Sequence, residues 1–289
     1  MEKIKIITDS ASDVPLEYEK SYEIEIIPFE ISLDGENYLE RRDFCEKEFY
    51  KILEKSEGMP VTNQIMPHRF LQIFTHFFNR GYTDIIYISI NAKGSATNQN
   101  AHTAAKEFFE AHPDSINKFN IDIIDGGTYS YGYGYAVTLA AQKAKLSVPK
   151  AEIIAFINDW IGHVRVFLAP YSLKYAKKSG RISAAAAFAG ELLGIRPIII
   201  FEDGESRIID KVRHDKNVIP AIIKNAKSRM IPQTPYVVVL GDMDDKNEEM
   251  IEQCKKSFGY EPAEILPVGA TIACNSGSKI VALAIKSQL

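Results

Sequence analysis

A hydroxyl-bearing turn stands where a predicted strand gives way to a predicted helix. Residues 84–90 have the apolar character of a buried strand, and residues 97–111 have helical periodicity. The turn Asn91–Thr97 therefore places backbone N–H groups and the hydroxyl of Ser95 at the positive end of the helix, where a carboxylate could dock. Ser95 could equally be a helix cap, since serine is a favoured N-cap residue.

A second hydroxyl stands out in the polar extended segment from Pro60 to Pro67. A loop that enters a helix explains the end of this segment, because proline suits the first helical position. It does not explain Thr62, whose hydroxyl can both donate and accept a hydrogen bond. Thr62 is therefore a candidate for ligand contact.

The segment Thr8–Asp13 is rich in hydroxyls and carboxylates and follows the first predicted strand. Ligands of parallel α/β sheets bind beyond such strand ends, but the same residue types are ordinary turn and capping residues. Both interpretations remain open. The segment lacks the D-x-D spacing that pairs carboxylates for phosphoryl transfer, which disfavours a phosphatase.

Enzyme classes find little support in the sequence. No G-x-S-x-G nucleophile motif occurs, and the six histidines show neither H-E-x-x-H spacing nor evident pairing with a serine. Lys93-Gly94-Ser95 is not a phosphate-binding P-loop, because the first glycine and its spacing are absent. We expect a protein without catalytic residues, metal or cofactor; a low-activity hydrolase remains an alternative.

Composition limits the partners and the compartment. The chain has 289 residues, enough for two domains, and its formal net charge of −4 gives no general attraction to nucleic acids. The three cysteines are far apart, which suits a reducing compartment. The start lacks the pattern of a signal peptide, and the apolar stretch Ile182–Phe201 is broken by charges and a proline. We expect a cytoplasmic protein without stable membrane insertion.

Strand and helix patterns alternate in the first half of the chain, which favours a mostly parallel sheet covered by helices. The predicted strands are Ile4–Thr8, Ile24–Leu33, Asp84–Ile90 and Ile121–Asp125, and the predicted helices are Pro67–Asn79 and Thr97–Ala111.

The second half predicts a mixed sheet. Two helices are expected on either side of Gly180, and an Asp-Gly turn at residues 203–204 should join a hairpin. We therefore expect an α/β fold with two unlike domains, residues 1–157 and 158–289, and a ligand between them. Further elements are predicted as helices from Ala151 to His163, from Asn217 and from Asn247 to Phe258, and as strands Val164–Leu168, Arg196–Phe201, Arg207–Val212, Tyr236–Leu240 and Glu264–Val268.

Five ordered motifs resemble those of the DegV family of bacterial fatty-acid-binding proteins. They span nearly the whole chain, which makes them more specific together than any one alone. The matching segments are Thr8–Pro15 for T-D-S-x-x-D-[LV]-P, Thr62–Pro67 for T-S-Q-P-S-P, Ser95–Ala101 for S-G-T-x-Q-x-A, Asp125 with Gly132 and Gly134 for D-S…G-x-G, and Leu173–Ser183 for L-x-Y-L-x-x-G-G-R-I-S.

The resemblance implies a carrier with a long-chain fatty acid between its two domains. It also implies a partner resembling dihydroxyacetone kinase, which phosphorylates the bound acid to an acyl phosphate for phospholipid synthesis. By position in the motifs, Thr62 and Ser95 would hydrogen-bond the carboxylate. Arg181 would lie near the headgroup and the kinase; the alternative is a surface ion pair. A helix at Ala184–Ala189, with Phe188, Leu192 and Leu193, is a candidate wall for the tail.

The largest departure from the family lies near the C-terminus. Where the family has H-T-G-P-G, this chain has Asn275-Ser276-Gly277-Ser278-Lys279. Asn275 and Ser276 can hydrogen-bond a headgroup, but asparagine cannot take up a proton as histidine does. The departure places kinase-coupled transfer in question. A binding module for another amphiphile or for a phosphorylated small molecule remains the alternative.

Overall fold

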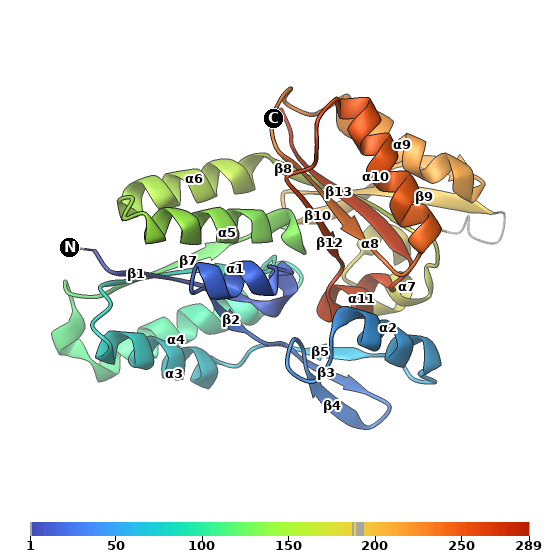
Figure 1. Cartoon of the computed structure of the whole chain (residues 1–289). Helices are drawn as coiled ribbons and strands as arrows, with labels where there is room; N and C mark the ends of the chain where they lie inside the picture. The colour runs from blue at the N-terminus through green and yellow to red at the C-terminus, as the bar shows by residue number, and fades with distance from the viewer. Residues whose placement is uncertain (1, 187, 189–193, 289) are drawn as a thin grey trace.

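The computed structural model describes residues 2–186, 188 and 194–288, which form two main sheets and a smaller antiparallel sheet (Figure 1). Sheet A is parallel, sheet C is mixed, and each has its own covering helices. The predicted fold class of two unlike α/β domains is confirmed.

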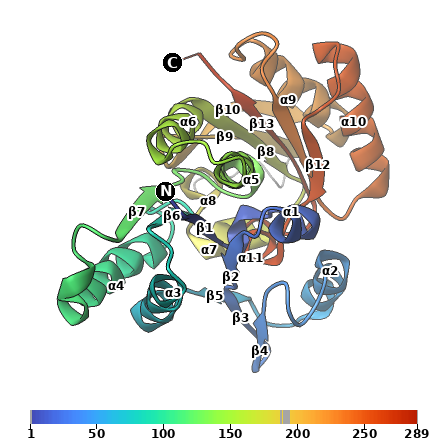
Figure 2. The same cartoon turned by 60° about the vertical axis from the view of Figure 1, so that its left-hand side comes forward.

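Sheet A has the strand order β2-β1-β6-β7. Helices α3 and α4 cover one face and α5 and α6 the other, so the central strands are buried on both sides (Figures 1 and 2). The strands are β1 (Ile4–Asp9), β2 (Glu25–Ile27), β6 (Asp84–Ser89) and β7 (Asn120–Asp125). The helices are α3 (Pro67–Asn79), α4 (Thr97–Ala111), α5 (Tyr131–Lys145) and α6 (Lys150–His163).

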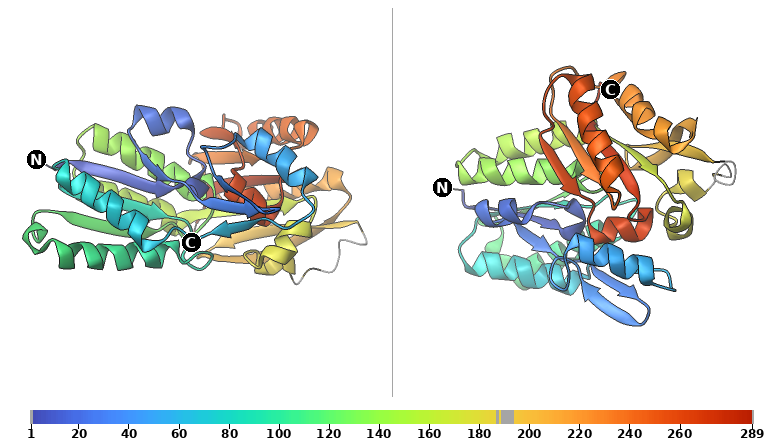
Figure 3. Two further views of the ribbon diagram at one scale, coloured as in Figure 1. Left: turned by 90° about the horizontal axis from the view of Figure 1, so that it is seen from below. Right: turned by 45° about the vertical axis from the view of Figure 1, so that its right-hand side comes forward.

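Sheet C has the strand order β10-β9-β8-β13-β11-β12. Side chains alternate between its faces: Val166 and Leu168 join the core shared with sheet A, while Phe167 and Ala169 pack with α9 and α10 in a second core. Helices α9 and α10 cover this second face of sheet C (Figure 3). The strands are β8 (Val164–Pro170), β9 (Ile195–Glu202), β10 (Glu205–Arg213), β11 (Tyr236–Leu240), β12 (Glu264–Pro267) and β13 (Ile280–Lys286). The helices are α7 (Lys174–Ser179), α8 (Ser183–Ala186), α9 (Val218–Lys227), α10 (Asp244–Phe258) and α11 (Ala270–Ser276).

The predicted single strand Ile24–Leu33 is wrong. Residues 25–27 form β2 in sheet A, whereas β3 (Glu30–Leu33) pairs with β4 (Glu36–Leu39) and β5 (Val61–Asn63) in sheet B. Pro28 separates the two strands, and proline lacks the N–H that a continuous ladder would need. Strand β5 contacts α11, which also contacts α2 (Glu46–Lys55), and α1 (Leu16–Ser21) precedes β2 in the chain.

The hairpin and the helices around Gly180 are confirmed. Gly180 ends α7 with φ of +72°, and β9 pairs with β10 across the turn at residues 203–204. Of the predicted helix Ala184–Ala189, residues 184–186 are helical, whereas 187 and 189 lie outside the described residues. The predicted domain boundary after residue 157 falls within α6 and stays a prediction. None of the helices in the described ranges is long and apolar enough to span a membrane.

Candidate functional site

A cavity of about 640 Å³ lies between the carboxyl edge of sheet A and the inner face of sheet C. The five predicted site residues come from four separate segments, and all of them line it. They are Thr62, Ser95, Arg181, Asn275 and Ser276. Their meeting at one cavity is a finding of the structure; their role in binding stays a prediction.

Ser95 lies in the loop between β6 and α4 and is half-buried. Its Oγ is 2.9 Å from Oγ1 of Thr97 and accepts a long hydrogen bond of 3.3 Å from the Thr97 N–H. The N-cap residue of α4 is Ala96, and it has no side-chain capping hydrogen bond, so the alternative interpretation of Ser95 as the helix cap is wrong. Ser95 precedes the cap and lines the cavity.

Thr62 lies on β5 opposite Ile31 of β3. Its neighbour Asn63 is tied to the same small sheet, because its Nδ2 donates to Glu30 (3.0 Å) and to Ser32 (3.1 Å). Pairing within sheet B therefore positions Thr62 at the cavity, and the side-chain amide of Asn63 is engaged in hydrogen bonds to β3.

Asn275 and Ser276 lie at the end of α11 and are partly committed to the helix. Asn275 Nδ2 donates to the Thr271 carbonyl (2.8 Å), and Ser276 Oγ donates to the Ile272 carbonyl (3.0 Å). Among the hydrogen bonds of the described residues, none uses the second N–H or the amide oxygen of the Asn275 side chain. Ser276 has its proton engaged, so it presents mainly acceptor lone pairs.

Arg181 is exposed at the rim of the cavity, directly after the left-handed Gly180. Its Nη1 donates to the Ser179 carbonyl (2.7 Å), and none of the ion pairs formed within the described ranges includes it. Burial raises the pKa of the nearby Tyr129 hydroxyl, and the charge of Arg181 acts in the opposite direction. The guanidinium thus lies within electrostatic reach of Tyr129, another lining residue.

The apolar part of the cavity is the inner face of sheet C. Apart from Phe201 of β9, the side chains here are small or branched, which leaves room for an extended ligand. They include Val166 and Leu168 of β8, Val239 of β11, and Ala282 and Ala284 of β13.

Phe188, a predicted tail wall, is buried in the core but is not one of the described residues that line the cavity. Leu192 and Leu193 lie outside the described residues. No group of three potential metal ligands is found within the described ranges.

The segment Thr8–Asp13 is buried behind the cavity. Asp9 accepts hydrogen bonds from Tyr133 Oη (2.6 Å), Tyr87 Oη (3.0 Å) and the Ile90 N–H (2.8 Å). These bonds fit the interpretation of the segment as structural turn residues. The Asp9 carboxylate supports the end of β6, where the loop that carries Ser95 starts.

Two more carboxylates are buried near the cavity: Asp13, which belongs to the segment Thr8–Asp13, and Glu40, which the sequence analysis missed. Glu40 accepts the N–H (2.7 Å) and the hydroxyl (2.6 Å) of Thr271, and Asp13 accepts the hydroxyl of Ser130. Burial, followed by the charge of Glu40, raises the pKa of Asp13 well above its ordinary value. Thr271 and Ser130 both line the cavity, so these acids fix part of its wall.

Comparisons with known proteins agree with this architecture. A family model described as an uncharacterised protein of the DegV family matches residues 3–288. A DegV domain-containing protein of Caldanaerobacter subterraneus subsp. tengcongensis is 35% identical over 261 residues, which are 90% of this chain and 89% of the relative.

Two solved structures share the fold over their whole length. A stearic-acid-binding protein from Eubacterium ventriosum has a TM-score of 0.86 at 21% identity, covering 99% of this chain and 98% of that one. A DegV family protein from Eubacterium eligens, loaded with heptadecanoic acid, has a TM-score of 0.82 at 20% identity, covering 99% and 100%. At these identities the likeness establishes the fold.

The Asp9 network predicts a pH-dependent stability. Burial raises the pKa of Asp9 from 3.8 to about 6, so folding binds a proton between these values. The contribution of Asp9 to the free energy of unfolding is therefore most favourable below pH 3.8 and is lost as the pH rises through about 6. Denaturant unfolding of Asp9→Asn should show a flatter pH dependence in this window than the native chain does. The exposed control Asp114→Asn should keep the native slope; parallel profiles for all three proteins would contradict the prediction.

Proposed function

The chain belongs to the DegV family, and from this premise we propose that it binds a long-chain fatty acid in the cavity between sheets A and C. The carboxylate lies at the polar end, near Thr62 and Ser95. The acyl chain lies on the inner face of sheet C. The single observation that carries the proposal is that one cavity joins the predicted hydroxyls to a broad apolar wall.

The polar end suits an anionic headgroup. Thr62 and Ser95 each bring a hydroxyl, and the first N–H groups of α4 point toward the same loop. Arg181 at the rim adds a fixed positive charge, which attracts a carboxylate and suits a phosphate formed from it. Hydrogen bonds to a charged group are stronger than neutral ones, so a few donors suffice to orient the acid.

The apolar end suits a long tail. The lining residues of β8, β11 and β13 are aliphatic, and burying methylene groups against them contributes about 0.8 kcal/mol per group. The tail therefore supplies most of the affinity and the headgroup contacts supply its orientation. The structures of relatives named for stearic and heptadecanoic acid support the same ligand class for this chain.

The proposed role is that of a carrier without a reaction of its own. The bound carboxylate is presented at the rim beside Arg181 to a kinase resembling dihydroxyacetone kinase, which forms the acyl phosphate. The chain works in the cytoplasm, with residues 1–157 carrying the carboxylate-binding loops and residues 158–289 covering the acyl chain.

The ligand class is tested on the purified native protein. Native mass spectrometry followed by organic extraction should release a co-purified long-chain acid, because the apolar lining of the cavity buries the tail. An empty protein that takes up no added stearic acid, or one loaded with a sugar phosphate, would contradict the proposal.

The headgroup assignment is tested with Thr62→Val and Ser95→Ala. Each should weaken the binding of stearic acid by about 1–3 kcal/mol, because a buried charged acceptor loses a donor. Isothermal titration measures the change. Thr103→Val, on an exposed position of α4, is the matched control and should bind like the native chain. Native affinity in both site variants would refute the assignment.

The Asn275 departure is tested with Asn275→His. A kinase-coupled assay that compares the native chain with this variant measures acyl phosphate formation at saturating acid. We expect higher transfer by the variant, because an imidazole can hold a proton at the headgroup. Equal rates would show that Asn275 does not limit transfer.

A further inference from the structure

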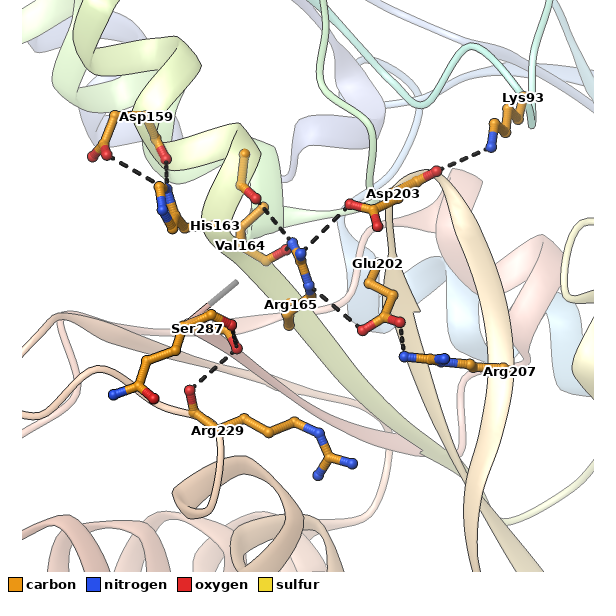
Figure 4. Close-up of polar contacts among 12 residues, drawn as sticks. Lys93, Asp159, His163, Val164, Arg165, Glu202, Asp203, Arg207, Arg229 and Ser287 are labelled. Atoms are coloured by element: carbon orange, nitrogen blue, oxygen red, sulfur yellow. Dashed lines mark hydrogen bonds and ion pairs between the residues drawn. The ribbon is translucent and has the colours of Figure 1, made fainter.

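Two turns that are far apart in sequence meet at the edge of the cavity. The loop between β6 and α4 carries Ser95, and the turn between β9 and β10 carries Gly204. Asn91 Nδ2 donates to the Gly204 carbonyl at 2.8 Å, across 113 residues of sequence. Lys93 Nζ adds a bond to the Asp203 carbonyl at 3.1 Å (Figure 4).

Asn91 is fully buried and also organises its own loop. Its main-chain oxygen accepts the N–H groups of Gly94 (3.0 Å) and Ser95 (3.2 Å), and its Oδ1 accepts the N–H of Lys93 (3.1 Å). The residue that reaches the opposite sheet is therefore the same residue that shapes the turn bearing Ser95. The side chain takes part in the turn through the bond from the Lys93 N–H to Oδ1, two residues before Ser95.

The β9–β10 turn is a fixed anchor for this contact. Asp203 and Gly204 have φ of +52° and +76°, the left-handed pair of a tight hairpin. Arg165, buried on β8, lies 3.6 Å from Glu202 and 3.5 Å from Asp203, while Glu202 also pairs with Arg207 (Figure 4). The turn is thus held by ion pairs within sheet C, independently of its hydrogen bond with Asn91.

Gly204 is required for the close approach. A Cβ built at this position would lie 2.9 Å from Asn91 Oδ1 and 3.2 Å from Lys93 Cδ. Glycine suits this position for two reasons: its backbone is left-handed, and a side chain would collide with Asn91.

Residues next to each partner of the contact line the cavity. Tyr129, whose hydroxyl accepts the second Asn91 hydrogen bond at 3.0 Å, packs edge-on against Phe201 of β9 at 5.1 Å between ring centres. Tyr129 and Phe201 are lining residues, as are Lys93 and Ser95. Separating the loop from the turn would therefore open the wall of the cavity at the Ser95 end.

We propose that Asn91 is a positioning residue for Ser95, and that its bond to the Gly204 carbonyl closes the cavity and slows release of the bound acid. This proposal rests on the proposed function of the same cavity. Lys93 contributes less, because its pairing with Glu205 (2.9 Å) is largely exposed, whereas the Asn91 amide is buried.

The test is a double-mutant cycle between Asn91→Leu and Ser95→Ala in the full chain. The probe is cis-parinaric acid, a naturally fluorescent long-chain acid, and its displacement by excess stearic acid gives the dissociation rate. Asn91→Leu should raise Kd about ten-fold in the native background, mainly through faster dissociation. In the Ser95→Ala background the same change should raise Kd by a smaller factor, because the opening of the cavity still contributes whereas the displacement of Ser95 no longer does.

The matched control is Asn247→Leu. Asn247 also donates its amide to a glycine carbonyl, that of Gly241 at 2.8 Å, but it lies on α10 away from the cavity. The control should keep the native Kd and dissociation rate. Unchanged binding by Asn91→Leu, or an equal loss in both backgrounds, would overturn the proposal. If Ser95→Ala alone binds normally, the proposed contact between Ser95 and the carboxylate fails instead.

Hydrogen–deuterium exchange of the native chain tests the same contact when Asn91→Leu does not fold. Addition of stearic acid should protect residues 91–95 and residues 202–206 together, because the loop and the turn open as one unit. Protection of the loop without any change in the turn would overturn the proposal.

Discussion

The site depends on the three hydrogen bonds that the buried Asp9 carboxylate accepts. The carboxylate is buried at the end of β1 and accepts the N–H of Ile90, the first residue after β6. Its two tyrosine partners, Tyr87 and Tyr133, come from β6 and α5, so one carboxylate joins a sheet to the helix layer beside it. The loop that carries Ser95 starts from this fixed point and is then shaped by Asn91.

Two further buried carboxylates act in the same way close to Asp9, since Glu40 accepts the hydroxyl of Ser10 and its charge acts on Asp9. Glu40 binds the N–H and the hydroxyl of Thr271 at the start of α11, and Asp13 binds Ser130. Buried carboxylates are costly unless hydrogen-bonded, so each imposes a definite position on the hydroxyls around it. The cavity wall is therefore held by polar contacts from behind, while its inner surface stays largely apolar along sheet C.

The sequence predicted the elements with clear periodicity and the residues in motifs. Ser95 could be predicted because the N-terminus of a helix that follows a strand carries free N–H groups and a partial positive charge. Thr62 could be predicted because no local structural role explained its hydroxyl. The sequence analysis missed α5, because Gly132 and Gly134 weaken helix propensity and the helix is buried around most of its surface. Gly134 is needed there, since a Cβ would lie 2.1 Å from the Ser12 carbonyl. Contacts such as Glu40 with Thr271, 231 residues apart, leave no local pattern to detect.

The most direct measurement is a crystal structure of the native chain with stearic acid. We expect the carboxylate oxygens to lie within hydrogen-bonding distance of Thr62 Oγ1 and Ser95 Oγ, and the tail to run over Val166 and Ala282 on sheet C. An acid bound with its carboxylate at sheet C, or bound outside this cavity, would contradict the central claim.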